Sequence, residues 1–322
     1  MMHGSQSASR AQRNAEHGSH ALLGLVGAVE RWPELAQRAA QSNCTILITG
    51  ETGVGKGRLA LWIHANSPRA QAAFIPVNCG AIPESVIDSQ LFGHTRGAFT
   101  GAHADHPGFV RAAEHGTLFL DEVSELPPSA QIRLLRLLQE REVQPVGCAR
   151  PVNINVRVVA ATNRELHELV ANQNFRQDLL FRLDVIQLRV KPLRDRPRDL
   201  PVLIDAFTSE FAELYDRPRL VFDRAAMNLL RAYHWPGNIR QLRTLIERLY
   251  VLLPDESVSV SRLLDVGQIG AALGEAAPVS MTIVRRETVQ RVVAESGGSI
   301  TRAASVFGVH RSTIYRWLNR AK

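Results

Sequence analysis

TILITGETGVGKG, residues 45–57, joins an apolar β-branched run to a turn with glycines at 50, 53 and 55 and then to a helix-like segment. A glycine-rich turn between a strand and a helix lets successive backbone N–H groups converge on phosphate oxygens, and the helix N-terminus adds a favourable dipole. The pattern predicts a phosphate-binding loop made by Gly50, Glu51, Thr52, Gly53, Val54, Gly55, Lys56 and Gly57. We expect Lys56 to reach the β- and γ-phosphates of a nucleotide.

A second signal for a nucleotide site lies in TLFLDEV, residues 117–123, where two carboxylates follow a strand-forming apolar run. Taken alone, such a pair more often marks a strand leaving the core. After a phosphate-binding loop, it predicts that Asp121 holds Mg²⁺ and that Glu122 polarises the attacking water. Gly57 stands where the common pattern has a Ser or Thr hydroxyl for Mg²⁺, so other metal ligands must come from water and from elsewhere. The sequence therefore predicts Mg²⁺-dependent nucleotide hydrolysis.

The strands around these motifs alternate with helical segments. TILITG, FIPVN, TLFLDEV and VRVVAAT are separated by amphipathic stretches such as QIRLLRLLQERE. This alternation predicts an α/β fold with a parallel sheet covered by helices. After KPLRDRPRDLP the strand signals stop and helical periodicity continues to about residue 264. We expect a disordered leader (1–21), an α/β domain (22–194), a helical subdomain (195–265), a Gly- and Ala-rich linker (266–280) and a small all-α module (281–322).

Charge is unevenly distributed along the 322 residues, whose formal net charge is +7. Residues 281–322 contain eight basic and two acidic side chains, which gives +6 for this segment. Such a compact basic segment favours nucleic-acid binding, although a solvated charged helix is the simpler alternative. No apolar run is long enough to span a bilayer, and we expect a cytoplasmic protein. The three cysteines have no metal-ligand spacing, and we expect reduced, buried thiols.

SITRAASVFGVHRSTIYRWLNR, residues 299–320, has the spacing of a helix-turn-helix. Ala304 allows close helix approach, Gly308 permits the turn, and Ile314 packs the second helix onto the first. The second helix would present side chains to base edges of double-stranded DNA, and flanking arginines would meet phosphates. The candidate DNA-binding residues are Arg302, His310, Arg311, Ser312, Thr313, Arg316 and Arg320.

From about residue 22 to residue 264 the chain resembles the central AAA+ domain of bacterial enhancer-binding proteins, which activate RNA polymerase carrying sigma-54. The most specific element of the resemblance is GAFTGA, residues 97–102. The resemblance implies an AAA+ P-loop NTPase with a helical lid, which uses ATP, and a Fis-type helix-turn-helix module. It also implies a loop that contacts sigma-54 and moves with the state of the nucleotide. The implied contact residues are Gly97, Ala98, Phe99, Thr100, Gly101 and Ala102.

Further positions take roles only through this resemblance. Asn78 would hold Glu122 until the γ-phosphate is sensed, and Thr162 and Asn163 would lie near that phosphate and the water. Arg176 and Arg182 would enter the neighbouring subunit's site as arginine fingers, within a homo-oligomeric ring for which the resemblance implies a hexamer. The nucleotide would also be reached from the lid by Arg240. Taken singly, each arginine would more often form a surface salt bridge.

Thr95 and Arg96 depart from the family pattern, which commonly has an acidic residue before the hexapeptide. Gly57 also stands where the family often has an acidic residue, so the missing hydroxyl does not argue against hydrolysis. Because the segment before residue 22 is short, the chain resembles members regulated in trans by a binding protein. Two alternatives to an ATP-hydrolysing sigma-54 activator stay open. One is a DNA-binding repressor with ATP as a structural ligand, and the other is another AAA+ DNA-remodelling protein such as a helicase loader.

Overall fold

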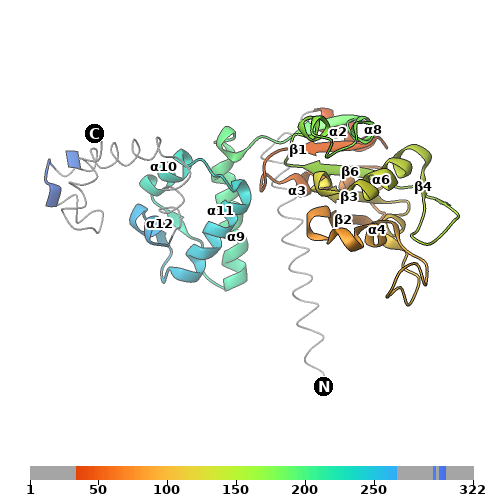
Figure 1. Cartoon of the computed structure of the whole chain (residues 1–322). Coiled ribbons are helices and arrows are strands. Elements are labelled where there is room, and N and C mark those ends of the chain that lie inside the picture. The colour runs from red at the N-terminus through yellow and green to blue at the C-terminus, as the bar shows by residue number, and fades with distance from the viewer. Residues whose placement is uncertain (1–33, 267–292, 295–296, 302–322) are drawn as a thin grey trace, which may run out of the picture. The chain divides into compact units, whose positions relative to one another are not determined.

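The computed structural model describes residues 34–266, 293–294 and 297–301 (Figure 1). The predicted leader, most of the linker and nearly all of the helix-turn-helix module, including its seven candidate DNA-binding residues, lie outside these ranges. The chain divides into two compact units, with the break between Asp199 and Leu200. Each unit is described separately below.

The first unit is built on a parallel sheet of five strands in the order β2-β3-β6-β1-β7. The strands are β1 (Ile46–Thr49), β2 (Phe74–Asn78), β3 (Thr117–Asp121), β6 (Arg157–Thr162) and β7 (Ile186–Arg189). Asn78 is paired with Asp121, and Thr49 with Thr162, so the carboxyl ends of four strands meet at one edge of the sheet. This sheet confirms the predicted α/β class.

Helices cover both faces of this sheet (Figure 1). On one face, α2 (Glu34–Gln41) and α3 (Lys56–Ala65) pack on Ile46 and Ile48 of β1. The other face, which includes Leu47, is covered by α4 (Glu84–Phe92), α5 (Gly108–Ala112), α6 (Pro128–Glu140), α7 (Leu166–Ala171) and α8 (Gln177–Leu183). The alternation of Ile46, Leu47 and Ile48 follows from the two-residue period of a strand with apolar layers on both sides.

Short elements connect the helices and strands of the first unit. The 3₁₀ turns are η1 (Cys79–Ala81), η2 (Val123–Glu125) and η3 (Leu193–Asp195), and β4 (Glu142–Val143) pairs antiparallel with β5 (Val152–Asn153). At the edge of the sheet opposite the strand ends, the buried Arg157 donates to the carbonyl oxygens of Ala39 (2.6 Å) and Ala40 (2.8 Å). These are carbonyls of the last turn of α2, which have no partner within the helix. Arg157 therefore fastens α2 to the sheet.

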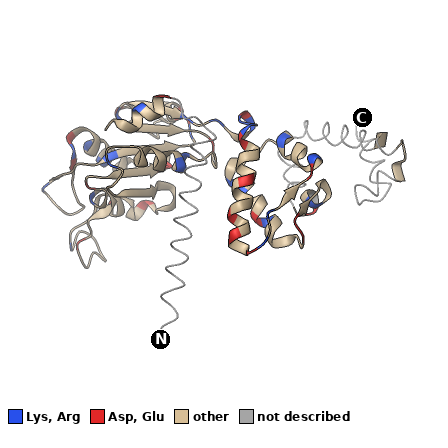
Figure 2. Ribbon diagram, turned by 180° about the vertical axis from the view of Figure 1, so that it is seen from behind, with Lys and Arg blue, Asp and Glu red and all other residues tan. Residues whose placement is uncertain are grey.

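The second unit is mainly helical. It contains α9 (Asp199–Tyr215), α10 (Arg224–Ala232), α11 (Asn238–Leu252) and α12 (Val260–Val266). Its core is closed by Tyr250, whose hydroxyl donates to Thr208 O (2.8 Å) and accepts from Leu220 N (3.2 Å). Acidic residues recur along α9 in Figure 2. The unit also has a short parallel pair, β8 (Val221–Phe222) with β9 (Ser257–Val258), which the sequence did not predict because two-residue strands carry no periodicity.

Within the part of the chain that the structure describes, every helix is too short or too polar to span a lipid bilayer.

Asp223 provides a test of helix capping in the second unit. Its carboxylate accepts from Ala226 N at 2.6 Å and caps the N-terminus of α10. Asp223→Ala should lower the free energy of unfolding by about 1 kcal/mol, because a helix N–H loses its partner. Asp205→Ala is the matched control, since its pair with Arg219 is largely exposed (3.3 Å) and should change stability by less than about 0.5 kcal/mol. Urea unfolding of both variants measures the difference, and equal losses would contradict the capping role.

Candidate nucleotide site and partner-contact loop

The glycine-rich loop lies between β1 and α3, as the sequence predicts. Gly50, Gly53 and Gly55 have φ of 152°, 79° and 104°, values that L-residues rarely adopt. The buried Lys56 opens α3, and its Nζ donates to Gly50 O (2.8 Å) and Glu51 O (3.1 Å). The ammonium group is thus held against the loop, and the first N–H groups of α3 lie beside it. This arrangement fits the phosphates of a nucleotide.

Residues that follow β7 bind the same loop, and the sequence analysis did not single them out. Arg194 forms two hydrogen bonds with the Glu51 carboxylate, at 2.9 and 2.5 Å. Arg196 donates to Val54 O (3.2 Å) and pairs with Asp199 (3.4 Å). Burial raises the pKa of Asp199, although Arg196 opposes that shift. The only signal in the sequence is the run of arginines in KPLRDRPRDLP, which a solvated segment would also show.

Asp121 and Glu122 lie at the carboxyl end of β3. Asp121 Oδ1 accepts from Glu122 N (3.1 Å), and Glu122 has left-handed backbone angles (φ 56°, ψ 45°) that are uncommon for Glu. A Cβ on Gly80 would lie 2.5 Å from Glu122 Oε2 and 3.5 Å from Asn78 Oδ1. The Glu122 carboxylate therefore occupies the space that a side chain at position 80 would fill, and Asn78 lies close by. Sequence reasoning missed Gly80, since this close approach leaves no local pattern.

The two carboxylates also affect the neighbouring thiol. Burial raises the pKa of Cys79 to about 12, and Asp121 and Glu122 contribute to the same shift. Cys79 therefore stays a protonated thiol at neutral pH. The expectation of buried thiols is correct for Cys79 but wrong for Cys44 and Cys148, which are partly exposed; all three cysteines are free.

Thr162 is the last residue of β6, and Asn163 follows it. Asn163 Nδ2 donates to Thr52 Oγ1 (3.0 Å), so this side chain reaches the loop directly. Thr162 is fully buried; its hydroxyl accepts from Arg164 N (3.0 Å) and lies 3.2 Å from Ser124 Oγ. The structure thus places Asn163 at the site and Thr162 beneath it, where it joins the end of β6 to η2.

GAFTGA lies in a loop closed at its base by two hydrogen bonds between the backbones of His94 and His106, both 2.9 Å. Within the loop, Gly97 N donates to Ala102 O (2.9 Å). Phe99 is 42 % exposed, and its ring meets the edge of the His94 ring at a centroid distance of 5.0 Å. Gly97, Thr100 and Gly101 are also exposed, Ala98 is half-buried, and Ala102 is buried. The contact residues expected from the sequence therefore do not form one exposed set.

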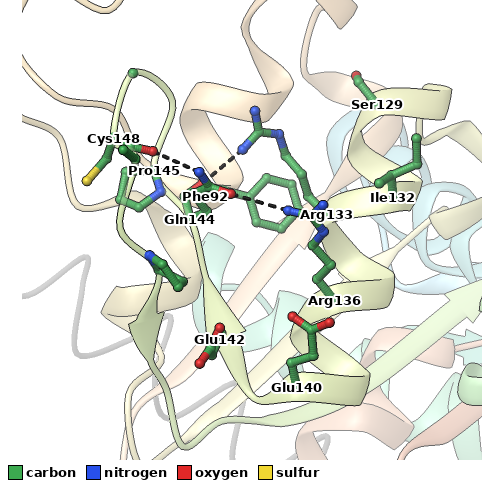
Figure 3. Close-up of a pocket in the computed structure, with 13 residues that line it drawn as sticks. Phe92, Ser129, Ile132, Arg133, Arg136, Glu140, Glu142, Gln144, Pro145 and Cys148 are labelled. Carbon is green, nitrogen blue, oxygen red and sulfur yellow. Dashed lines mark hydrogen bonds between the residues drawn. The ribbon is translucent and has the colours of Figure 1, made fainter.

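A second loop, residues 144–151, supports the first, and sequence reasoning missed it. Thr95 N donates to Val146 O (3.0 Å), and Val146 N donates to Gly93 O (2.8 Å). Gln144 is held from α6 by Arg133 Nη1 on its carbonyl (2.8 Å) and Arg136 Nη1 on its side chain (3.3 Å). Figure 3 shows this network beside a pocket of about 780 Å³ between α6 and the loop.

The arginines with expected roles differ in their surroundings. Arg176 is bound by Asp178 through two hydrogen bonds, Nε to Oδ1 (3.0 Å) and Nη2 to Oδ2 (2.7 Å). This pairing raises the pKa of Arg176 and lowers that of Asp178. Arg182 is exposed on α8 and makes no ion pair with any residue that the structure describes. Arg240 is exposed in the first turn of α11, in the second unit.

Comparison with known families covers most of the chain. Residues 22–189 match the family described as Sigma-54 interaction domain, residues 194–270 the AAA+ ATPase lid domain, and residues 280–322 a homeodomain-like domain. The alginate biosynthesis transcriptional regulatory protein AlgB of Pseudomonas putida is 42 % identical over 285 residues, which are 88 % of this chain and 63 % of AlgB. The transcriptional regulatory protein ZraR of Salmonella typhimurium is 40 % identical over 94 % of this chain and 70 % of ZraR. The chain thus spans about half to 70 % of the length of such relatives.

Solved structures agree with this assignment. NtrX from Brucella abortus in complex with ATP is 32 % identical, with a TM-score of 0.69 over 89 % of this chain and 66 % of NtrX. A RuvB mutant from Thermotoga maritima is 17 % identical with a TM-score of 0.51, which shows likeness of fold alone. With its parallel sheet, helical lid and hexapeptide loop, the chain belongs to the Sigma-54 interaction domain family and has the AAA+ fold.

Proposed function

We propose that this protein is an ATP-driven transcription activator that remodels the closed complex of sigma-54 RNA polymerase into an open complex. The observation that carries the proposal is Phe99, an exposed aromatic side chain on the GAFTGA loop, whose base is bonded to the 144–151 loop. The loop lies in the same unit as the glycine-rich loop, Lys56 and the carboxylates Asp121 and Glu122. A repressor that uses ATP only as a structural ligand would need neither Glu122 nor an exposed hexapeptide.

ATP hydrolysis is proposed from the side chains at the strand ends. Lys56 and the backbone N–H groups of the loop would bind the phosphates, and Glu122 would accept a proton from the attacking water. Asp121 fits Mg²⁺, which would neutralise charge on the phosphates. The described residues contain no cluster of three or more His, Cys, Asp or Glu side chains around a metal position. The remaining ligands would be water and phosphate oxygens, the usual shell of Mg²⁺ at nucleotides.

A homo-oligomeric ring, with six subunits by the family resemblance, is proposed because arginine fingers act on the nucleotide of a neighbouring subunit. Arg182, exposed on α8, and Arg176 would offset negative charge at the neighbouring subunit's nucleotide. Arg240 would reach the nucleotide of its own chain from the lid. NtrX from Brucella abortus was solved in complex with ATP, and we propose the same ligand for this chain.

The basic segment 281–322 is proposed to bind an enhancer site on double-stranded DNA, in agreement with its match to a homeodomain-like domain. A partner that acts in trans is proposed as the regulator. Because both DNA and polymerase are its targets, we propose that the protein works in the cytoplasm.

Gly80 tests the placement of the catalytic carboxylate. Gly80→Ala should leave the melting temperature and ATP binding nearly unchanged, because the new Cβ meets the mobile end of Glu122 rather than backbone. The displaced carboxylate should slow ATP hydrolysis by a factor on the order of 10–100. The double variant Gly80→Ala/Glu122→Ala should be no slower than Glu122→Ala alone, since both changes act through one carboxylate. Steady-state phosphate release measures all three, and a fully active Gly80→Ala would disprove the placement.

Phe99 tests the proposed activity itself. Phe99→Ala should cost no more than about 1 kcal/mol of stability, because the ring is 42 % exposed and its aromatic contact is with the His94 ring at the base of the loop. It should retain ATP hydrolysis and DNA binding and abolish sigma-54-dependent transcription in vitro. The matched control is Phe92→Ala, which removes a buried ring only seven residues away and should cost about 3–5 kcal/mol. Full transcription activity of Phe99→Ala would refute the proposed contact.

Alanine substitutions of two arginines test the proposed DNA binding of segment 281–322. Arg311→Ala should relax sequence preference if Arg311 contacts a base, whereas Arg320→Ala should weaken binding to all sequences and reduce the slope against log salt by about 1. Fluorescence anisotropy with specific and scrambled duplexes at several salt concentrations measures both effects. Site-specific binding by a chain that ends at residue 280 would overturn the assignment of the module.

A further inference from the structure

Gln131 is a buried polar side chain in an otherwise apolar part of α6. It is 1 % exposed and lies on the same side of the helix as Ala130, Leu134 and Leu137, which are all buried. Its Nε2 donates to Leu126 O (2.8 Å) and Asn174 O (3.2 Å), and its Oε1 accepts from Arg176 N (2.9 Å). The amide orientation is fixed, because a flipped amide would set N–H against N–H. One side chain therefore joins two backbone segments that are about fifty residues apart in sequence.

The first of these segments carries the catalytic carboxylate. Glu122 is the N-cap residue of η2 and Leu126 its C-cap residue: Glu125 N donates to Glu122 O (2.9 Å) and Leu126 N to Val123 O (3.3 Å). Val123 and Leu126 are themselves buried in the core. This turn is fixed by its own hydrogen bonds and by packing, so it does not depend on Gln131 alone.

The second segment carries the arginine fingers. Arg176 is the N-cap residue of α8, and its backbone N–H has Gln131 as its one partner among the described residues. Its carbonyl accepts from Leu180 N (3.1 Å) and so starts the helix on which Arg182 lies. The segment before α8 is also held by Asn174 N and Phe175 N, which both donate to Leu169 O (2.8 and 3.2 Å), and by the buried Phe175. The Gln131 amide adds a polar connection from α6 to the first residue of the finger helix.

We propose that Gln131 is a positioning residue for catalysis across the subunit boundary: it sets the finger segment 174–176 in register with the turn that carries Glu122. The proposal rests on the proposed ATPase ring. Gln131 is buried and acts through the backbone of Arg176. In this arrangement, a shift of the turn that carries Glu122 would also shift Arg176, which acts at the neighbouring subunit's site.

Gln131→Met tests the proposal, because Met has a similar volume and keeps none of the three hydrogen bonds. The variant should bind ATP normally and lose turnover by a factor on the order of 10–100, since the finger is misplaced. Its own Lys56, Asp121 and Glu122 stay in place. Mixed with Glu122→Ala chains, whose fingers are intact, it should regain activity. Random 1:1 mixing predicts about a quarter of the wild-type rate per chain, because a quarter of the interfaces then pair an intact site with an intact finger.

Two further variants distinguish a loss of positioning from a general loss of stability. Thr117→Val removes a buried hydroxyl at the far end of β3, where it bonds His64, and should lower the melting temperature without changing turnover. Gln131→Glu keeps an acceptor for the Arg176 N–H, although its second oxygen would face Leu126 O and Asn174 O, and at an equal folded fraction it should retain more turnover than Gln131→Met. Failure of both Gln131 variants to fold would make Gln131 a structural residue and overturn the proposal.

A mixture of Arg176→Ala chains with Glu122→Ala chains shows whether active sites are shared between subunits at all. If this mixture regains ATPase activity and the mixture of Gln131→Met with Glu122→Ala chains does not, the positioning role is overturned and the proposed ring ATPase stands. If turnover per wild-type chain does not change with dilution and neither mixture regains ATPase activity, the proposal of active sites shared between subunits is refuted. The proposed role of Gln131 is then refuted with it. Unchanged turnover of Gln131→Met at an equal folded fraction would also overturn the proposal.

Discussion

The parallel register of β1, β2, β3 and β6 places polar residues from distant parts of the chain at one edge of the sheet. Asn78 lies opposite Asp121 and Thr49 opposite Thr162, so the ends of these strands are neighbours because of backbone hydrogen bonds alone. Apolar layers on both faces keep the strands buried and the register unambiguous. The loops that leave this edge can then differ in sequence while their first residues stay in place, which is the usual basis for ligand sites in open α/β sheets.

Polar contacts connect this edge to the rest of the first unit. The hydroxyl of the buried Thr162 lies beside Ser124 in η2, the exposed Asn163 binds Thr52 in the glycine-rich loop, and the buried Gln131 bonds both Leu126 and the start of α8. For Thr162 and Gln131 the contact replaces hydrogen bonds to water, and leaving one partner unpaired in the interior would cost about 1–3 kcal/mol. Such a hydrogen bond is either made or broken, so the segments that it joins take one of a few distinct positions rather than a continuous range of positions. A change in one turn is therefore felt by the segments bonded to it.

The sequence was sufficient for the features that rest on local patterns. The strand before Gly50, the carboxylates after Leu120 and the α/β alternation are all visible in short windows, and the fold class is confirmed. Contacts between distant segments were not visible. Gly80 is explained by Glu122 Oε2, forty-two residues away, and the 144–151 loop supports GAFTGA through backbone groups that any residues could supply. Gln131 looked like one more polar residue of an amphipathic helix, because its burial depends on α8 packing against α6.

The two proposed fingers differ, because Arg176 alone combines a fixed backbone N–H with a side chain that must be released from an ion pair. The Arg176 N–H is bonded to a buried amide that solvent cannot replace, whereas its guanidinium pairs with Asp178 at the exposed surface, where water and salt screen the attraction. A nucleotide phosphate of the neighbouring subunit would carry more charge than one carboxylate and could therefore take over the guanidinium. Arg182 faces no such competition within the described part of the chain. Release of Arg176 would then add a step that depends on the neighbour's nucleotide, whereas Arg182 would be available as soon as subunits assemble.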